Sequence, residues 1–210
     1  MHSRSMMKII KNLSKRCRSV LCLGGDLPCD FIKPIGLPIV AADGAANVLI
    51  QSGLEPYIIL GDLDSVDEAL LRGRPHLRIE SQDSTDFEKA LDYIEKESLA
   101  PTIVMGMFGG YADHVLGNIS IFSRTQFFGI SGDVIFTTLN GERCFEVPLN
   151  TKISIFGIPR CTITSSGLKW ELHDDALSIG GMNSHSNRAA EENVLLRVSS
   201  GRAIIFLSSF

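Results

Sequence analysis

The sequence has no long hydrophobic run and no excess of positive charge. None of its segments approaches the roughly 18 consecutive apolar residues that a membrane-spanning helix needs. Twenty basic side chains stand against 24 acidic ones, a formal net charge of -4, so the chain as a whole has no electrostatic attraction to nucleic acid or to an anionic bilayer. We therefore expect a soluble protein whose partners are small molecules, with no nucleic acid and no membrane among them.

Paired cysteines and metal-binding cysteine motifs are also missing. The five cysteines include no Cys-x-x-Cys pair, and no histidine lies near them at the spacing of a metal site. An odd number of unpatterned cysteines is typical of reduced thiols, so we expect a cytoplasmic protein. The N-terminal apolar patch is too short for a secretory signal, and residues 1–18 are expected to form a loose leader.

From residue 19 to about residue 140, short apolar runs alternate with longer helix-like stretches. This alternation is typical of β-α-β units, whose parallel strands form one sheet. Strands are expected at residues 20–23, 38–42, 57–60, 77–79, 102–105 and 134–137. A helix is expected after Asp113, followed by a turn at residues 129–132. The sequence thus predicts an α/β domain with a Rossmann-like parallel sheet over residues 19–140.

The clearest helix begins near Thr85. Thr85 and Glu88 have the spacing of a capping box, in which each side chain bonds the backbone N–H of the other residue. An apolar stripe at helical spacing follows, made of Phe87, Ala90, Leu91 and Ile94. Asp86 and Lys89 fall outside this stripe, and we expect both at an exposed first turn.

The pattern changes after Asn140-Gly141, a dipeptide typical of two-residue hairpin loops. Beyond it no long amphipathic helix is expected, and short strands alternate with turns such as Ser200-Gly201. We expect residues 141–210 to form a small all-β domain.

Glycine and aspartate follow the first five expected strands. The carboxyl ends of the strands in an open parallel sheet share one edge, so these turns converge on one crevice. They lie at residues 24–26, 43–44, 61–64, 83–86 and 106–110. We expect the ligand site there.

Two of these turns carry paired carboxylates. Asp62 and Asp64 can both reach a hard cation, and the next turn adds Asp83 and Asp86. Four carboxylates at one edge repel one another unless a cation lies between them, and phosphoryl transfer uses Mg²⁺ on the phosphate oxygens. The turns therefore predict a Mg²⁺-nucleotide site, with Lys89 supplying a charge for a phosphate. The alternatives are a helix cap for Asp64 and a solvated ion pair for Lys89.

A glycine-rich segment, residues 106–110, leads into Asp113 and His114 at an expected helix N-terminus. The backbone N–H groups of such a segment can bind an anion. Its spacing fits neither a Walker A loop nor the dinucleotide fingerprint. We assign no catalytic role to His114, and Asp113 either caps its helix or contacts a substrate.

The only tryptophan, Trp170, precedes a polar loop at residues 183–187. A flat aromatic ring near amide and hydroxyl donors suits a heteroaromatic ligand. A core tryptophan and a solvated loop are the alternative.

Five ordered motifs resemble those of the thiamine pyrophosphokinases. They are residues 24–28 (GGDLP), 42–47 (ADGAAN), 61–65 (GDLDS), 82–91 (QDSTDFEKAL) and 109–114 (GGYADH). Residues 167–170 (GLKW) and the pair Ser186-Asn187 are similar to the thiamine-contacting segment of that family. The resemblance runs from about residue 20 to the C-terminus.

The resemblance implies an enzyme that transfers pyrophosphate from ATP to thiamine, giving thiamine diphosphate and AMP. It implies a homodimer, an α/β catalytic domain and a C-terminal β-sandwich, with thiamine between the catalytic domain of one subunit and the sandwich of the other. The implied catalytic residues are Asp43, Asp62, Asp64 and Asp86, of which Asp62, Asp64 and Asp86 hold Mg²⁺. The implied ATP contacts are Asp83, Thr85, Lys89, Gly109, Gly110, Tyr111 and Asp113. Trp170 would stack on thiamine, with Ser186 and Asn187 at its pyrimidine.

Three positions depart from the family pattern: Tyr111 stands where an arginine is frequent, Ala45 where a second glycine is, and Arg188 where glutamate is common. Tyrosine cannot replace the charged fork of a guanidinium. Two rival functions therefore stay open: a related pyrophosphokinase acting on another alcohol such as a hydroxymethylpterin, and a non-catalytic thiamine- or nucleotide-binding protein. Trp170 with Ser186-Asn187 speaks against the first, and the retained aspartates speak against the second.

Overall fold

The computed structural model describes residues 2–208, without the side chains of residues 2–6 and 8. These residues form two compact units. The first contains residues 6–121 and 127–132, and the second contains residues 2–5, 122–126 and 133–208. Among the described residues, no helix has the length and apolar character needed to cross a membrane.

A parallel sheet forms the centre of the first unit. Its strand order is β6 (Phe128–Ser131), β5 (Thr102–Met105), β1 (Ser19–Cys22), β2 (Ile39–Ala42), β3 (Ile58–Gly61) and β4 (His76–Arg78). Strands β1, β2, β3 and β5 are buried along their whole length, which explains why they read as unbroken apolar runs. The order reverses beside β1, since β2 follows on one side and β5 pairs on the other. A reversal of this kind opens a crevice at the carboxyl ends of the strands.

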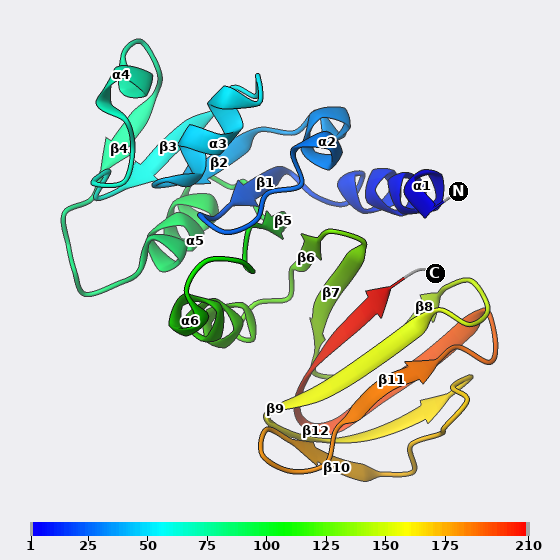
Figure 1. Cartoon of the computed structure of the whole chain (residues 1–210). Coiled ribbons are helices and arrows are strands. Elements are labelled where there is room, and N and C mark those ends of the chain that lie inside the picture. The colour runs from blue at the N-terminus through cyan, green and yellow to red at the C-terminus, as the bar shows by residue number, and fades with distance from the viewer. Residues whose placement is uncertain (1, 209–210) are drawn as a thin grey trace. The chain divides into compact units, whose positions relative to one another are not determined.

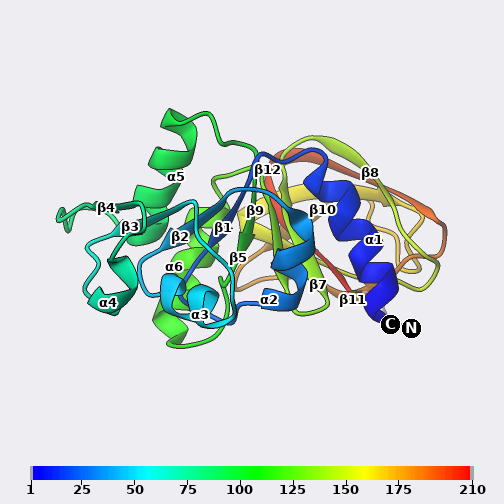
Figure 2. The same cartoon turned by 90° about the horizontal axis from the view of Figure 1, so that it is seen from above.

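The helices are α1 (His2–Ser14), α2 (Cys29–Ile32), the 3₁₀ turn η1 (Lys33–Ile35), α3 (Ala45–Gln51), α4 (Glu68–Leu71), α5 (Asp86–Lys96) and α6 (Ala112–Phe122). Figures 1 and 2 show α3 and α5 on opposite faces of the parallel sheet. Helix α5 packs on β2 and β3, and it begins with the expected capping box. The first unit is therefore α/β, as the alternating pattern indicated.

Three expectations for this part of the chain were wrong. Residues 2–14 form a helix instead of a loose leader, with Ile10 buried at 1% exposure. The turn expected at residues 129–132 is mostly strand β6, whose register aligns Ile103 with Phe128. Lys89 is buried, not exposed, because α5 turns it toward the strands on which the helix packs.

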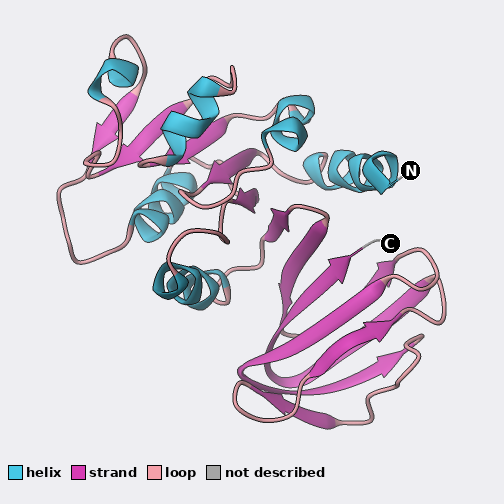
Figure 3. Ribbon diagram, in the orientation of Figure 1, coloured by secondary structure: helices cyan, strands magenta, loops and turns pink. Residues whose placement is uncertain are grey.

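The second unit is made of antiparallel strands (Figure 3). They are β7 (Val134–Leu139), β8 (Glu142–Glu146), β9 (Lys152–Ser166), β10 (Asp175–Ser178), β11 (Ser184–Arg188) and β12 (Asn193–Ser208). Strand β12 pairs with β7, β8 and β9, and β9 also pairs with β10 and β11. One apolar core, which includes Phe145, Ile163 and Leu196, holds these strands together.

The hairpin expected at Asn140-Gly141 is absent from the described pairings. Strands β7 and β8 both pair with β12, and the Gly141 carbonyl accepts a hydrogen bond from Val198 N–H at 2.8 Å. Strands β7 and β8 thus follow one another along one side of β12. As a result β7 belongs to the second unit, although that unit was expected to begin only at residue 141. Likewise, Ser200-Gly201 lies at a register shift inside β12 instead of forming a turn between short strands.

The capping box at α5 gives a stability prediction. Thr85 Oγ1 accepts a hydrogen bond from Glu88 N–H at 3.2 Å, and Glu88 accepts one from Thr85 N–H at 3.1 Å. Replacing Thr85 by Ala should lower the free energy of unfolding by about 1 kcal/mol. Urea denaturation of the ligand-free protein measures this change. Thr85→Ser keeps the hydroxyl and is the control, so equal losses in the two variants would contradict the assignment.

Candidate functional site

Three aspartates meet at the carboxyl ends of β2 and β3. Asp43 follows β2, Asp62 follows β3 and Asp86 opens α5, and each offers a carboxylate oxygen within 4.8 Å of the other two. Gly61 makes this approach possible: its φ is +145°, and a Cβ there would lie 3.0 Å from Asp86 Oδ1 and 3.1 Å from Asp43 Cβ. A side chain at residue 61 would push the carboxylates apart.

Asp43 lies deepest in this group. It is 9% exposed, and its Oδ1 is buried with no hydrogen-bond partner among the described residues. Burial raises the pKa of Asp43 above its usual value. Hydrogen bonds from Ser65 and from the Gly44 backbone oppose this effect, and the charges of Asp86 and Asp62 add to it. A buried carboxylate oxygen without a partner costs free energy unless a cation binds it. The group therefore fits a hard cation that takes oxygen ligands.

The carboxylate of Asp62 is in a different environment. The Gln82 side-chain amide donates to it at 3.2 Å and lowers its pKa, with smaller contributions from the Asp64 backbone N–H and from Lys89. Asp62 is therefore held in its ionised form beside the buried Asp43.

Lys89 is the cation of this site. Its ammonium lies 3.0 Å from Asp86 Oδ1, and its side chain is 4% exposed. The ion pair with Asp86 exists, but it is buried instead of solvated, so both the expected exposure and the solvated alternative were wrong for Lys89. A buried ammonium beside three carboxylates offsets part of their repulsion.

The remaining predicted residues of the acidic turns make local contacts. Asp64 is outside the group of three, and its carboxylate accepts a hydrogen bond from Ser65 Oγ at 2.9 Å. Asp83 accepts one from Ser81 Oγ at 3.1 Å, and Thr85 caps α5. Asp43 thus takes part in the observed group of three together with Asp62 and Asp86. The roles of Asp64, Asp83 and Thr85 stay predictions.

Two loops meet at the carboxyl ends of β1 and β5, where the strand order reverses. Gly25 N–H donates to the Gly106 carbonyl at 3.0 Å, and Asp26 N–H donates to the Phe108 carbonyl at 2.6 Å. A Cβ on Gly109 would lie 2.6 Å from Asp26 Cγ, so a side chain at residue 109 would displace this carboxylate. Asp26 was not among the predicted site residues, although it ends the Gly-Gly-Asp turn after the first strand.

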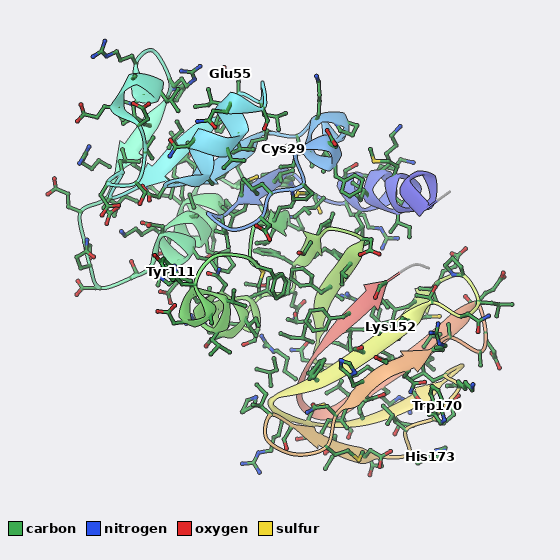
Figure 4. The ribbon with its side chains drawn as sticks, viewed as in Figure 1. Cys29, Glu55, Tyr111, Lys152, Trp170 and His173 are labelled. Atoms are coloured by element: carbon green, nitrogen blue, oxygen red, sulfur yellow. The ribbon has the colours of Figure 1, made fainter. Side chains whose placement is uncertain are left out.

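Tyr111 follows this glycine loop and is 76% exposed. Its ring lies edge-on to that of His114, with 5.7 Å between centroids, and Figure 4 shows it beside the start of α6. Asp113 accepts a hydrogen bond from His114 N–H at 3.0 Å. These side chains and the backbone of Gly110 are open to a ligand.

In the second unit, Trp170 is 56% exposed and lies at the periphery of the strands (Figure 4). This exposure excludes the core alternative. Lys169 Nζ is 4.8 Å from the centroid of the indole ring. Ser186 has a φ of 59°, and its Oγ is 3.0 Å from His185 Nδ1, whereas Asn187 is buried at 3% exposure.

Known proteins match both parts of the chain. The family model for the thiamin pyrophosphokinase catalytic domain matches residues 38–131, and that for the thiamin pyrophosphokinase vitamin B1 binding domain matches residues 142–205. Thiamine pyrophosphokinase 3 of Oryza sativa is 28% identical over 208 residues, covering 81% of this chain and 78% of the relative.

Solved structures share the fold. Yeast thiamin pyrophosphokinase superposes with a TM-score of 0.81 at 18% identity, over 97% of this chain and 90% of the other. Thiamine pyrophosphokinase from Bacillus subtilis gives a TM-score of 0.77 at 21% identity, over 91% and 99%.

The thiamin pyrophosphokinase 1 of Caenorhabditis elegans is 30% identical over 182 residues, which cover 77% of this chain and 75% of the relative. Together with the two domain matches in order along the sequence, this similarity shows that the chain belongs to the thiamine pyrophosphokinase family.

Proposed function

We propose that this protein transfers the terminal pyrophosphoryl group of ATP to the hydroxyethyl oxygen of thiamine, giving thiamine diphosphate and AMP. The observation that carries the proposal is the group formed by Asp43, Asp62 and Asp86 with the buried Lys89, in a chain of this family. Phosphoryl transfer is catalysed mainly by positioning and by offsetting negative charge, and this group can do both.

Mg²⁺ fits the three aspartates because all ligands are hard oxygen atoms and one of them, Asp43 Oδ1, is buried without another partner among the described residues. When bound, the ion supplies positive charge to the phosphate oxygens. Asp64, two residues from Asp62, is a further predicted ligand.

The reaction forms a bond between the thiamine hydroxyl oxygen and the β-phosphorus. It breaks the bond between that phosphorus and the oxygen bridging to the α-phosphate, and AMP leaves with this oxygen. The hydroxyl proton passes to water or to a carboxylate of the site. The glycine loop at residues 106–110 offers backbone N–H groups to the phosphates, and Lys89 holds the Asp86 carboxylate in place through a hydrogen bond.

We assign nucleotide binding to the first unit and thiamine binding to the second. The strand-order reversal between β1 and β5 supports a Rossmann-like nucleotide-binding sheet. The exposed Trp170 supports a thiamine-binding sandwich. The free state of all five cysteines supports a cytoplasmic location.

An assay of AMP and thiamine diphosphate by HPLC, after incubation with MgATP and thiamine, tests this function. Both products should appear together. AMP formed with a hydroxymethylpterin but not with thiamine would establish the rival pyrophosphokinase. Binding of thiamine without either product would establish the non-catalytic alternative.

The aspartate group gives the next prediction. Asp62→Asn should lower kcat by orders of magnitude and weaken the dependence on Mg²⁺, because a cation ligand is lost. The variant should still fold, since a repulsive charge is removed. Asp92→Asn is the control, because Asp92 lies on the exposed side of α5. Steady-state kinetics across a Mg²⁺ titration measure both variants, and a kcat near that of the wild type for Asp62→Asn would refute the metal assignment.

Tyr111 gives a prediction about ATP. Tyr111→Arg should lower the KM for ATP severalfold, because a guanidinium adds a charged fork beside the glycine loop. Tyr57→Arg makes the same change at another exposed tyrosine and should leave this KM unchanged. If Tyr111→Arg does not lower the KM for ATP, the side chain at residue 111 does not face the phosphates.

The proposal includes a homodimer whose sites each use the aspartates of one subunit and Trp170 of the partner subunit. An Asp62→Ala chain and a Trp170→Ala chain should each give weakly active homodimers. A heterodimer of the two, purified through different tags, has one site with both lesions and one with neither. It should recover up to about half of the wild-type activity per dimer. A heterodimer no more active than the two homodimers would show that each site uses one chain alone.

A further inference from the structure

We propose that Asn187 is a positioning residue that holds Trp170 in place for thiamine and does not itself bond the ligand. The inference rests on the proposed function and changes the role that the sequence suggested for Asn187, a contact at the pyrimidine. It is carried by the hydrogen bonds of the Asn187 amide.

Every hydrogen-bonding position of this amide is occupied. Nδ2 donates to the Trp170 carbonyl at 2.7 Å and to Ser184 Oγ at 3.1 Å. Oδ1 accepts from Trp170 N–H at 3.2 Å and from Arg188 N–H at 2.8 Å. A carboxamide has two N–H donors and two acceptor lone pairs. Because Asn187 is also 3% exposed, it has neither a free hydrogen-bonding group nor surface to offer a substrate.

The two bonds to Trp170 fasten its backbone on both sides of the residue. The adjacent peptide is fixed too, since Lys169 N–H donates to the Arg188 carbonyl at 2.8 Å. β11 thus supports the segment before and at Trp170 through three hydrogen bonds.

Glu171 adds hydrogen bonds to the residues that precede Trp170. Its carboxylate accepts hydrogen bonds from Gly167 N–H at 2.7 Å and Leu168 N–H at 3.0 Å, and a third from the Ser165 hydroxyl. The backbone around Trp170 is therefore held rigidly while its indole ring remains more than half exposed. A rigid backbone under an exposed aromatic ring lowers the entropy that is lost when a flat ligand stacks on it.

The bulge in β11 explains why Asn187 faces inward and Ser186 does not. The register with β9 shifts between Ser184 and Asn187, and Ser186 takes a positive φ with its N–H bonded to Ser154 Oγ at 3.0 Å. Ser186 stays half-buried, so its hydroxyl is the polar group of this pair that a ligand can reach.

The experiment uses Asn187→Asp, which keeps the shape and the acceptor Oδ1 but removes both N–H donors. The KM for thiamine should rise by about tenfold, as expected from the loss of hydrogen bonds to a buried group, whereas the KM for ATP should stay the same. Trp170 is the only tryptophan, so its fluorescence reports on the segment directly. Without substrates, the variant should show lower anisotropy and stronger quenching by acrylamide than the wild type.

Asn193→Asp is the control, because it makes the same change at an exposed residue of the same unit and should alter neither readout. Ser184→Ala removes one anchor of the amide and should shift both readouts in the same direction by less, which keeps the test valid if Asn187→Asp does not fold.

A raised KM for thiamine with unchanged fluorescence of the free variant would overturn the inference, because Asn187 would then contact thiamine directly. No change in either readout would overturn it as well. Failure of the proposed function looks different: the wild type would form no thiamine diphosphate, while the fluorescence of the free variants would still report whether Asn187 holds Trp170.

Discussion

The mutual repulsion of three carboxylates at one edge of a parallel sheet is the constraint on which the first unit depends. Asp43, Asp62 and Asp86 come from different turns, and the parallel strands bring those turns together whatever charge they carry. Burying Lys89 against Asp86 offsets part of the repulsion, and hydrogen bonding by Gln82 stabilises the charge on Asp62. Asp43 Oδ1, however, still has no hydrogen-bond partner in the part of the chain that the structure describes. The protein thus holds a geometry that is costly alone and favourable with a cation.

Two places at this edge of the sheet depend on close approach of the backbone: the group of three aspartates and the pair of loops after β1 and β5. Gly61 allows Asp43 and Asp86 to come together, and Gly109 leaves room for Asp26. In the second unit side chains do the positioning, since Asn187 and Glu171 form hydrogen bonds to the backbone around Trp170. Both arrangements hold side chains of the candidate site in place without a ligand.

Much of this could be predicted from the sequence where the signal is local. The central strands β1, β2, β3 and β5 are mainly apolar, the capping box is a fixed spacing, and the turns after the strands carry the aspartates. The burial of Lys89 could not be predicted, because it depends on which side of α5 meets β2 and β3. Nor could the close approach of Asp43 to Asp62 and Asp86, which depends on turn geometry. Asn140-Gly141 is a dipeptide typical of hairpin loops, but no hairpin forms there. The strands on either side of it, β7 and β8, both pair with β12 instead, and this tertiary pairing outweighs the local preference.

The pairing of β12 also has a consequence for synthesis of the chain. Within the second unit, β12 is the partner of β7, β8 and β9, yet it is the last of these strands to leave the ribosome. The earlier strands must therefore wait with open edges, where unpaired N–H and C=O groups favour association with other chains. The strands of the parallel sheet are all made by residue 131, so the first unit can form while the second is still incomplete. Nascent chains interrupted before β12 are expected to expose a folded catalytic half attached to an aggregation-prone remainder.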